Sequence, residues 1–131
     1  MTETRMVINH EYDVVSASMR TRQFASGLGF DTQIASLIAT VVSELGQNII
    51  KYGVQGYITL REIDIQKKIG IEIEASDSGP GINDIEKALQ ENFSTKNTLG
   101  LGLPGVKRML DELNIVCEPG KGTRIIGRKF L

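Results

Sequence analysis

Three polar residues, Glu44, Asn48 and Lys51, are spaced at helical intervals inside an otherwise apolar stretch of the chain. Apolar residues around them recur with the period of an α-helix, which predicts one long amphipathic helix. These residues are Ile34, Leu37, Ile38, Val41, Val42, Leu45 and Ile49. At about 100° per residue, the carboxylate, the amide and the amine all point toward the covered side of that helix.

This polar edge has two interpretations. Burying such groups without partners costs about 1–3 kcal/mol each, so something polar must meet them, and a ligand is one candidate. The alternative is a helix whose Asn48 and Glu44 are satisfied within the protein. Gly46 bears on the choice, because a glycine inside a helix costs about 1 kcal/mol relative to Ala and suggests a close approach of some kind.

Asp77-Ser78-Gly79-Pro80-Gly81 follows an apolar strand pattern and ends regular pairing there. A carboxylate at a strand end can accept a hydrogen bond from an exocyclic amine, while the glycine backbone packs against a planar ring. The alternative is a β-turn with Pro at its second position.

Gly100-Leu101-Gly102-Leu103-Pro104-Gly105 spells G-x-G-x-x-G. A dinucleotide site is excluded by context, because a polar loop precedes the motif and Gly120 stands where an acidic residue is needed. A P-loop is excluded because no Gly-Lys-Ser/Thr follows. The glycines and the helix start could approach a phosphate closely, and a flexible loop before a helix is the alternative.

The length, charge and composition of the whole chain limit the classes of protein to which it can belong. Its 131 residues are enough for one domain with a real core, covering 1–131. A formal net charge of −1, three Tyr, four Phe and no Trp argue against a nucleic-acid binder. The single Cys117 cannot form an internal disulfide and is interpreted as a small buried hydrophobe. One histidine excludes a His-cluster metal site. No leader or membrane-spanning run is present, so a cytoplasmic protein without membrane partners is expected.

The coarse pattern predicts an α/β fold: a two-layer sandwich whose mixed, mostly antiparallel sheet is covered on one face by helices. Strands are expected at 5–9, 57–63, 69–74, 114–117 and 123–130, with a turn at 66–68. Helices are expected at 12–28, from an Asp31-Thr32 cap to Tyr52, at 83–90, and from Pro104. That last helix should present Val106, Met109, Leu110 and Leu113 on one face, and 91–99 reads as a polar segment without a period.

The three motifs in this order resemble the GHKL ATP-binding superfamily, whose domain has the Bergerat fold. Glu-x-x-x-Asn on a helix is similar to the N box, Asp-x-Gly-x-Gly to the first glycine box, 91–99 to the ATP lid, and G-x-G-x-x-G to the second glycine box. The resemblance covers roughly residues 41–124. Within the superfamily, Phe93-Ser94-Thr95-Lys96 and the segment from Gly102 to Glu112 most resemble small serine kinases of bacterial partner-switching modules, of the stressosome switch-kinase type. Gln47 departs from that type, where Arg is expected.

The resemblance implies roles for named residues. Asn48 is the protein's ligand to Mg²⁺, Asp77 accepts from the adenine amine, and Thr123 supports adenine from the other side. Glu44 is the candidate general base. The remaining expected ATP contacts are Gly79 and Gly81 at the base, Gly100, Gly102 and Gly105 at the phosphates, and Lys51 and Lys96 as charge partners.

The resemblance further implies an ATP-dependent serine/threonine kinase that phosphorylates a STAS-domain regulator, associates with a large stressosome assembly, and binds and activates a downstream phosphatase once released. The rival is an anti-sigma factor that sequesters a sigma factor and phosphorylates its anti-anti-sigma partner. A scaffold with a degenerate ATP site is a third interpretation, and the intact Glu44, Asn48, Asp77 and glycines count against it.

Overall fold

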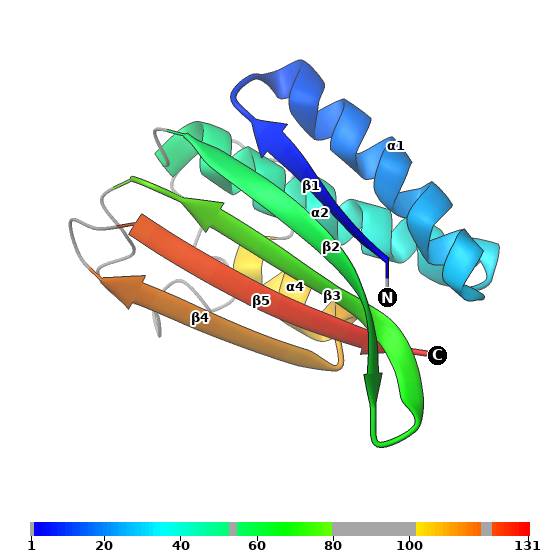
Figure 1. Cartoon of the computed structure of the whole chain (residues 1–131). Coiled ribbons are helices and arrows are strands. Elements are labelled where there is room, and N and C mark those ends of the chain that lie inside the picture. Colours follow the sequence, from blue (N-terminus) through cyan, green and yellow to red (C-terminus); the bar gives the residue numbers. More distant parts are fainter. Residues whose placement is uncertain (1, 53–54, 80–101, 119–121) are drawn as a thin grey trace.

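Five strands form one sheet, and the helices cover one of its faces (Figure 1). The computed structural model describes residues 2–52, 55–79, 102–118 and 122–131. In chain order the elements are β1 (Glu3–Ile8), α1 (Glu11–Leu28), α2 (Thr32–Tyr52), β2 (Gly56–Ile65), β3 (Lys68–Asp77), α4 (Gly102–Met109), β4 (Glu112–Glu118) and β5 (Gly122–Phe130). The strand order is β1-β2-β3-β5-β4, and each pairing between these strands is antiparallel. The two-layer α/β prediction is therefore confirmed. The sheet was expected to be mixed and mostly antiparallel, and among the described strands every pairing is antiparallel.

The core lies between the sheet and the helical layer, in which α2 contributes the most buried apolar side chains. The predicted stripe of α2 is buried at Ile38, Val42 and Leu45, against alternate residues of the central strands such as Leu60 and Ile73. Asp31 begins this helix as predicted, because its Oδ1 accepts a hydrogen bond of 2.8 Å from the Ile34 backbone N–H. The amphipathic period seen in the sequence therefore sets how α2 lies on the sheet.

Several element boundaries differ from the sequence prediction by one to three residues, and three of the differences bear on how the sheet is built. The turn between β2 and β3 contains two residues, Gln66 and Lys67, both in the left-handed region at φ of 54° and 69°. The regular pairing of β3 continues to Asp77, because β2 and β5 flank it on both sides. The helix α4 ends at Met109 and Leu113 belongs to β4. The chain leaves the helix where Asp111 accepts a hydrogen bond of 2.8 Å from the Phe130 backbone N–H of β5.

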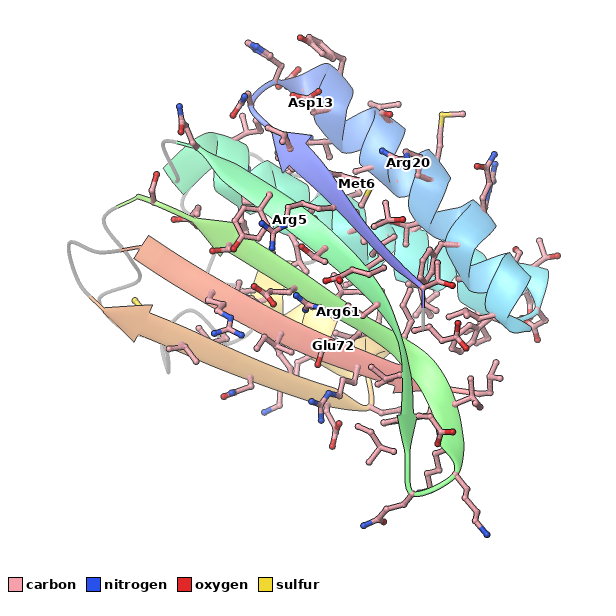
Figure 2. All side chains as sticks on the ribbon, in the orientation of Figure 1. Arg5, Met6, Asp13, Arg20, Arg61 and Glu72 are labelled. Carbon is pink, nitrogen blue, oxygen red and sulfur yellow. The ribbon has the colours of Figure 1, made fainter. Side chains whose placement is uncertain are left out.

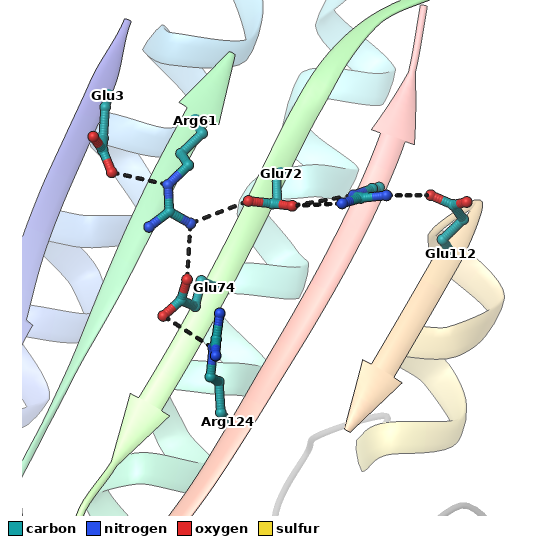
Figure 3. Close-up of polar contacts among 7 residues, drawn as sticks. Glu3, Arg61, Glu72, Glu74, Glu112 and Arg124 are labelled. Carbon is teal, nitrogen blue, oxygen red and sulfur yellow. Dashed lines mark hydrogen bonds and ion pairs between the residues drawn. The ribbon is translucent and has the colours of Figure 1, made fainter. Parts of the chain in front are cut away.

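The face of the sheet away from the helices carries a network of ion pairs, which we call the outer ladder (Figure 3). Neighbouring strands contribute alternating charges, and its members are Glu3, Arg61, Glu72, Glu74, Glu112, Arg124 and Arg128. Glu74 is only 5% exposed, and its two carboxylate oxygens contact Arg61 at 2.8 Å and Arg124 at 3.4 Å. The hydrogen bond from Arg61 to Glu74, helped by those to Glu3 and Glu72, raises the pKa of Arg61 above its ordinary value.

We expect Arg61→Ala to lower the free energy of unfolding by about 2–3 kcal/mol, because the nearly buried Glu74 carboxylate loses its shorter ion pair. Arg124→Ala is the matched control, since Arg124 is 53% exposed and contacts the same carboxylate at the longer distance. Urea unfolding of both variants measures the difference. Equal losses in the two variants would contradict this account of the outer ladder.

Candidate functional site

One row of cross-strand partners marks the end of the sheet where the predicted site residues gather. Ile8 of β1 pairs with Gly56, Gly56 with Asp77, Asp77 with Thr123, and Thr123 with Cys117. The row therefore crosses all five described strands. Asp77 and Thr123, which come from separate motifs far apart in the sequence, are direct partners in it.

The side chains of Asp77 and Thr123 point toward the helical layer. Alternate residues of β3 face the core, and Ile73 and Ala75 of that series are buried, so Asp77 continues the same face. The Asp77 side chain is half-buried, and its Oδ1 accepts a hydrogen bond of 2.9 Å from the Gly79 backbone N–H. This bond fixes the carboxyl group and occupies one oxygen. A ligand donor could reach the other oxygen.

Thr123 is 7% exposed and begins the inner face of β5. Gly122, the residue before it, adopts a φ of 109°, and a Cβ there would collide with the Asp77 carbonyl oxygen. Only glycine allows β5 to come this close to the end of β3. The backbone thus brings together Asp77 and Thr123, the two residues expected from the sequence to contact adenine.

The C-terminal end of α2 lies at the same end of the sheet. Ile49 packs onto Gly56, where an added Cβ would lie 2.6 Å from the Ile49 Cγ2. Asn48 immediately precedes Ile49, and Lys51 lies two residues after it. Glu44 lies about one helical turn before Asn48. All three polar side chains are half-buried and not covered, so they keep surface that a ligand could contact.

Gly46 has a structural explanation that the sequence left open. A Cβ at this position would lie 3.0 and 3.1 Å from the two γ carbons of Val14, so α1 crosses α2 here. Asn48 lies two residues further on, roughly 200° around the helix, away from that crossing. The close approach at Gly46 is therefore packing between helices, and it leaves the flank of α2 that carries Asn48 clear of α1.

The third group of expected contacts lies at the start of α4. Gly102 begins the helix at a φ of 62°, and Pro104 stands in its first turn as predicted. Leu103 and Val106 anchor the helix in the core, and Gly105 is buried. Figure 1 shows α4 running opposite to β4, so its N-terminal end faces the end of the sheet that carries Asp77. The free N–H groups of a helix start favour anions there.

Cys117 corrects one sequence interpretation. It is half-buried, not a buried core residue, and its Sγ lies 3.9 Å from the Thr123 Oγ1 at the site end of the sheet. A signal for this position was present, since a hairpin centred on Gly120 places residues 117 and 123 opposite each other. The residue type by itself carries no such signal, because the position follows from strand pairing.

Three expected contacts, Gly81, Lys96 and Gly100, lie outside the described residues, as do the predicted short helix at 83–90 and the lid at 91–99. Among the described residues, no group of three or more His, Cys, Asp or Glu side chains could hold a metal ion. No helix of the described part of the chain is long and apolar enough to cross a membrane.

Comparison with known proteins adds to this geometry. Residues 33–129 match the family described as histidine kinase-, DNA gyrase B-, and HSP90-like ATPase. The chain is 43% identical over 121 residues to the serine/threonine-protein kinase RsbT of Bacillus subtilis, covering 92% of this chain and 91% of that protein. It is 35% identical over 114 residues to the anti-sigma F factor of Caldanaerobacter subterraneus, covering 82% and 78%.

The fold has matches among solved structures as well. A mycobacterial sensor histidine kinase, MprB, aligns with a TM-score of 0.59 at 20% identity, covering 98% of this chain and 97% of that one. The catalytic domain of the histidine kinase ThkA aligns with a TM-score of 0.55. The family match spans most of the sequence and includes Glu44, Asn48, Asp77 and Thr123. The chain belongs to the histidine kinase-, DNA gyrase B- and HSP90-like ATPase family, the superfamily that its motifs resemble.

Proposed function

We propose that this chain is an ATP-dependent protein serine/threonine kinase that phosphorylates a hydroxyl group of a STAS-domain regulator. The similarity to RsbT supports the reaction, because it extends over nearly the full length of both proteins. The observation that carries the nucleotide site is the direct pairing of Asp77 with Thr123, at the sheet end that also receives the end of α2.

The adenine base binds at the paired ends of β3 and β5. Asp77 accepts a hydrogen bond from the exocyclic amine through the oxygen that Gly79 leaves unused. Thr123 supports the ring from β5, and Gly79 and Gly81 let the backbone lie against it. A carboxylate at this position distinguishes adenine, which has a donor there, from guanine, which has an acceptor.

The phosphates lie between α2 and the start of α4. Backbone N–H groups of the first turn, including those of Gly102 and Gly105, bind phosphate oxygens, and Pro104 has no N–H to contribute. Gly100 is the third glycine proposed to contact the phosphates, and Lys51 and Lys96 are the proposed charge partners. Asn48 would hold Mg²⁺ through its amide oxygen, a ligand type that this ion accepts. When bound, the metal would supply positive charge to offset the charge of the phosphates.

Glu44 acts on the attacking group. It lies one turn from Asn48 on the same helix, so its carboxylate reaches the same site without being required on the metal. It accepts the proton of the substrate hydroxyl as that oxygen attacks the γ-phosphorus and ADP leaves. Catalysis otherwise rests on positioning and electrostatic stabilisation, as is general for phosphoryl transfer.

The partners follow from the same proposal. The STAS-domain substrate belongs to a stressosome-type assembly, and the kinase released from it binds and activates a downstream phosphatase. A reaction that consumes ATP in such a module takes place in the cytoplasm. No nucleic acid or membrane takes part.

The second candidate function is an anti-sigma factor that also phosphorylates its antagonist. It is favoured by the similarity to anti-sigma F factors, at 35–36% identity over 114 residues in two examples. Affinity purification from the native host separates the two functions. Recovery of a sigma factor supports this second candidate, and recovery of STAS-domain assemblies supports the switch kinase.

We expect Asn48→Ala to weaken Mg·ATP binding by about 10-fold or more, because the protein loses its one proposed ligand to the metal and only water can take its place. Gln47→Ala is the matched control, since the neighbouring side chain points about 100° away around α2. Isothermal titration calorimetry with and without Mg²⁺ measures both variants. Wild-type Mg·ATP affinity in Asn48→Ala would rule out the proposed metal ligand.

A further inference from the structure

Gly56 begins β2 at a position where the absence of a side chain lets α2 lie close to the sheet. Its φ is not in the left-handed region, so other residues could adopt the same backbone conformation. Space is what requires glycine there. An added Cβ would lie 2.6 Å from the Ile49 Cγ2 and 2.6 Å from the Ser76 carbonyl oxygen, too close for any side chain.

The missing side chain of Gly56 would face the helical layer. Figure 2 shows the alternation on the neighbouring strand β1, where Arg5 lies over the outer face and Met6 points toward the helices. Met6 pairs with Ile58 of β2 and both are buried, so Gly56, two residues before Ile58, lies on the same face. Ile49 is only 3% exposed and occupies the space that a side chain at Gly56 would need.

This contact places the end of α2 against the strands that hold the proposed adenine contacts. Gly56 is the direct cross-strand partner of Asp77, and Asn48 immediately precedes Ile49 on the helix. The contact between Ile49 and Gly56 thus connects the helix turn that carries the proposed metal ligand to the strand pair that carries the proposed base contact.

We propose that Ile49, seated on Gly56, is a positioning residue that holds Asn48 in place relative to Asp77, so that one nucleotide reaches both. The inference rests on the proposed function, because it assigns a role toward the metal end of that nucleotide site. Ile49 suits the role because a β-branched side chain in a helix has one strongly preferred χ1 rotamer. Pressure on its Cγ2 methyl group therefore moves the helix rather than the side chain alone.

The tolerance of this contact is small. In Gly56→Ala, the Ile49 Cγ2 would have to retreat by about 0.8 Å to reach an ordinary contact distance of 3.4 Å. A misplacement of about 1 Å is enough to impair a functional group that depends on exact placement. Asp77 is also held by its pairing with Thr123, in which α2 takes no part. A change at Ile49 should therefore alter the metal end of the site and leave the base end in place.

An isomeric substitution tests this role. Ile49→Leu keeps the apolar volume but moves the branch from Cβ to Cγ, so the methyl group over Gly56 is lost. The quantity measured is the Mg²⁺-dependent gain, which is the ATP dissociation constant in EDTA divided by that in Mg²⁺, both from calorimetry. We expect Ile49→Leu to lower this gain by about 10-fold, a loss typical of residues that orient a metal ligand. The affinity for ATP in EDTA should change far less.

The matched control is Ile38→Leu, the same change at a fully buried position about three turns earlier on the same helix. It should keep the wild-type gain. Lowered stability does not by itself change the ratio, because a smaller folded fraction weakens both affinities by the same factor. Equal losses of the gain in Ile49→Leu and Ile38→Leu would reveal a general packing effect of α2 and overturn the proposal.

A second pair of variants tests the contact from the strand side. Gly56→Ala should also lower the Mg²⁺-dependent gain, and adding Ile49→Ala should restore most of it, because the new methyl group then takes the space of the one removed. The crowding against the Ser76 carbonyl oxygen is the same with and without Ile49→Ala, so it cancels in the comparison. A double variant without recovery would mean that the effect passes through β3, which overturns the role of Ile49.

The outcomes also separate this role from the proposed function. If Asn48→Ala abolishes the gain and Ile49→Leu leaves it unchanged, the positioning role is overturned and the proposed metal ligand stands. A wild-type protein that binds ATP without any Mg²⁺-dependent gain overturns the proposed metal ligand, and the positioning role with it.

Discussion

Replacing Glu44 with Gln is expected to lower the rate of phosphoryl transfer by about 10²–10⁴-fold, the usual loss on removing a general base. Gln keeps the size of the side chain and removes its ability to take a proton. Nucleotide binding should change little, because the proposed phosphate contacts are backbone N–H groups, lysines and Mg²⁺, and Glu44 is not among them. Single-turnover phosphorylation and calorimetric Mg·ATP affinity, measured on one preparation, separate the two effects.

The control for Glu44→Gln is Glu11→Gln, which neutralises an exposed acid in the first turn of α1. It should transfer phosphate at the wild-type rate. A merely structural Glu44 would give a lowered melting temperature and only a proportional loss of activity. Transfer at near wild-type rates by Glu44→Gln would exclude Glu44 as the base.

Replacing Asp77 with Asn is expected to lower ATP affinity by about 10–100-fold and to reduce the preference for ATP over GTP. A hydrogen bond to a charged acceptor contributes about 1.5–3 kcal/mol, and the neutral amide gives up part of it. The amide nitrogen can also donate to the guanine carbonyl, which the carboxylate repels. Competition of ATP and GTP against a fluorescent nucleotide measures both quantities.

The control for Asp77→Asn is Ser76→Ala, because the neighbouring side chain lies on the opposite face of β3. Its nucleotide preference should match that of the wild type. The hydrogen bond from the Gly79 N–H to Asp77 Oδ1 can persist in Asn, so the local turn should survive. Equal competition by GTP and ATP in the wild-type protein would refute base recognition by Asp77.

Local patterns in the sequence were sufficient to predict the helix that carries Glu44 and Asn48. The apolar period from Ile34 to Ile49 defines a buried face through contacts three and four residues apart, and Asp31 supplies the cap. The same reasoning predicted strands and a closing hairpin from alternation. It misplaced boundaries at Asp77 and Leu113, because neighbouring strands extended the pairing beyond the local signal.

The order of the motifs predicted the family and the candidate residues, but no local rule places Asp77 beside Thr123. Their pairing requires β5 to insert between β3 and β4, and Gly122 to adopt a conformation open to glycine. Likewise, the sequence alone gives no reason for a glycine at position 46, and only the crossing of α1 over α2, where Val14 packs against Gly46, accounts for it.

The outer ladder is the feature of the structure that the sequence predicted least. Glu3, Arg61 and Glu72 are ordinary polar residues of three separate strands, and nothing in their local spacing links them. Helix and strand patterns depend on residues only a few positions apart in the chain. The sequence by itself therefore decided which segments are helix or strand and which side chains could do chemistry. Strand order and register are set by how the whole chain buries its apolar faces, so only the tertiary structure decided which of those side chains meet.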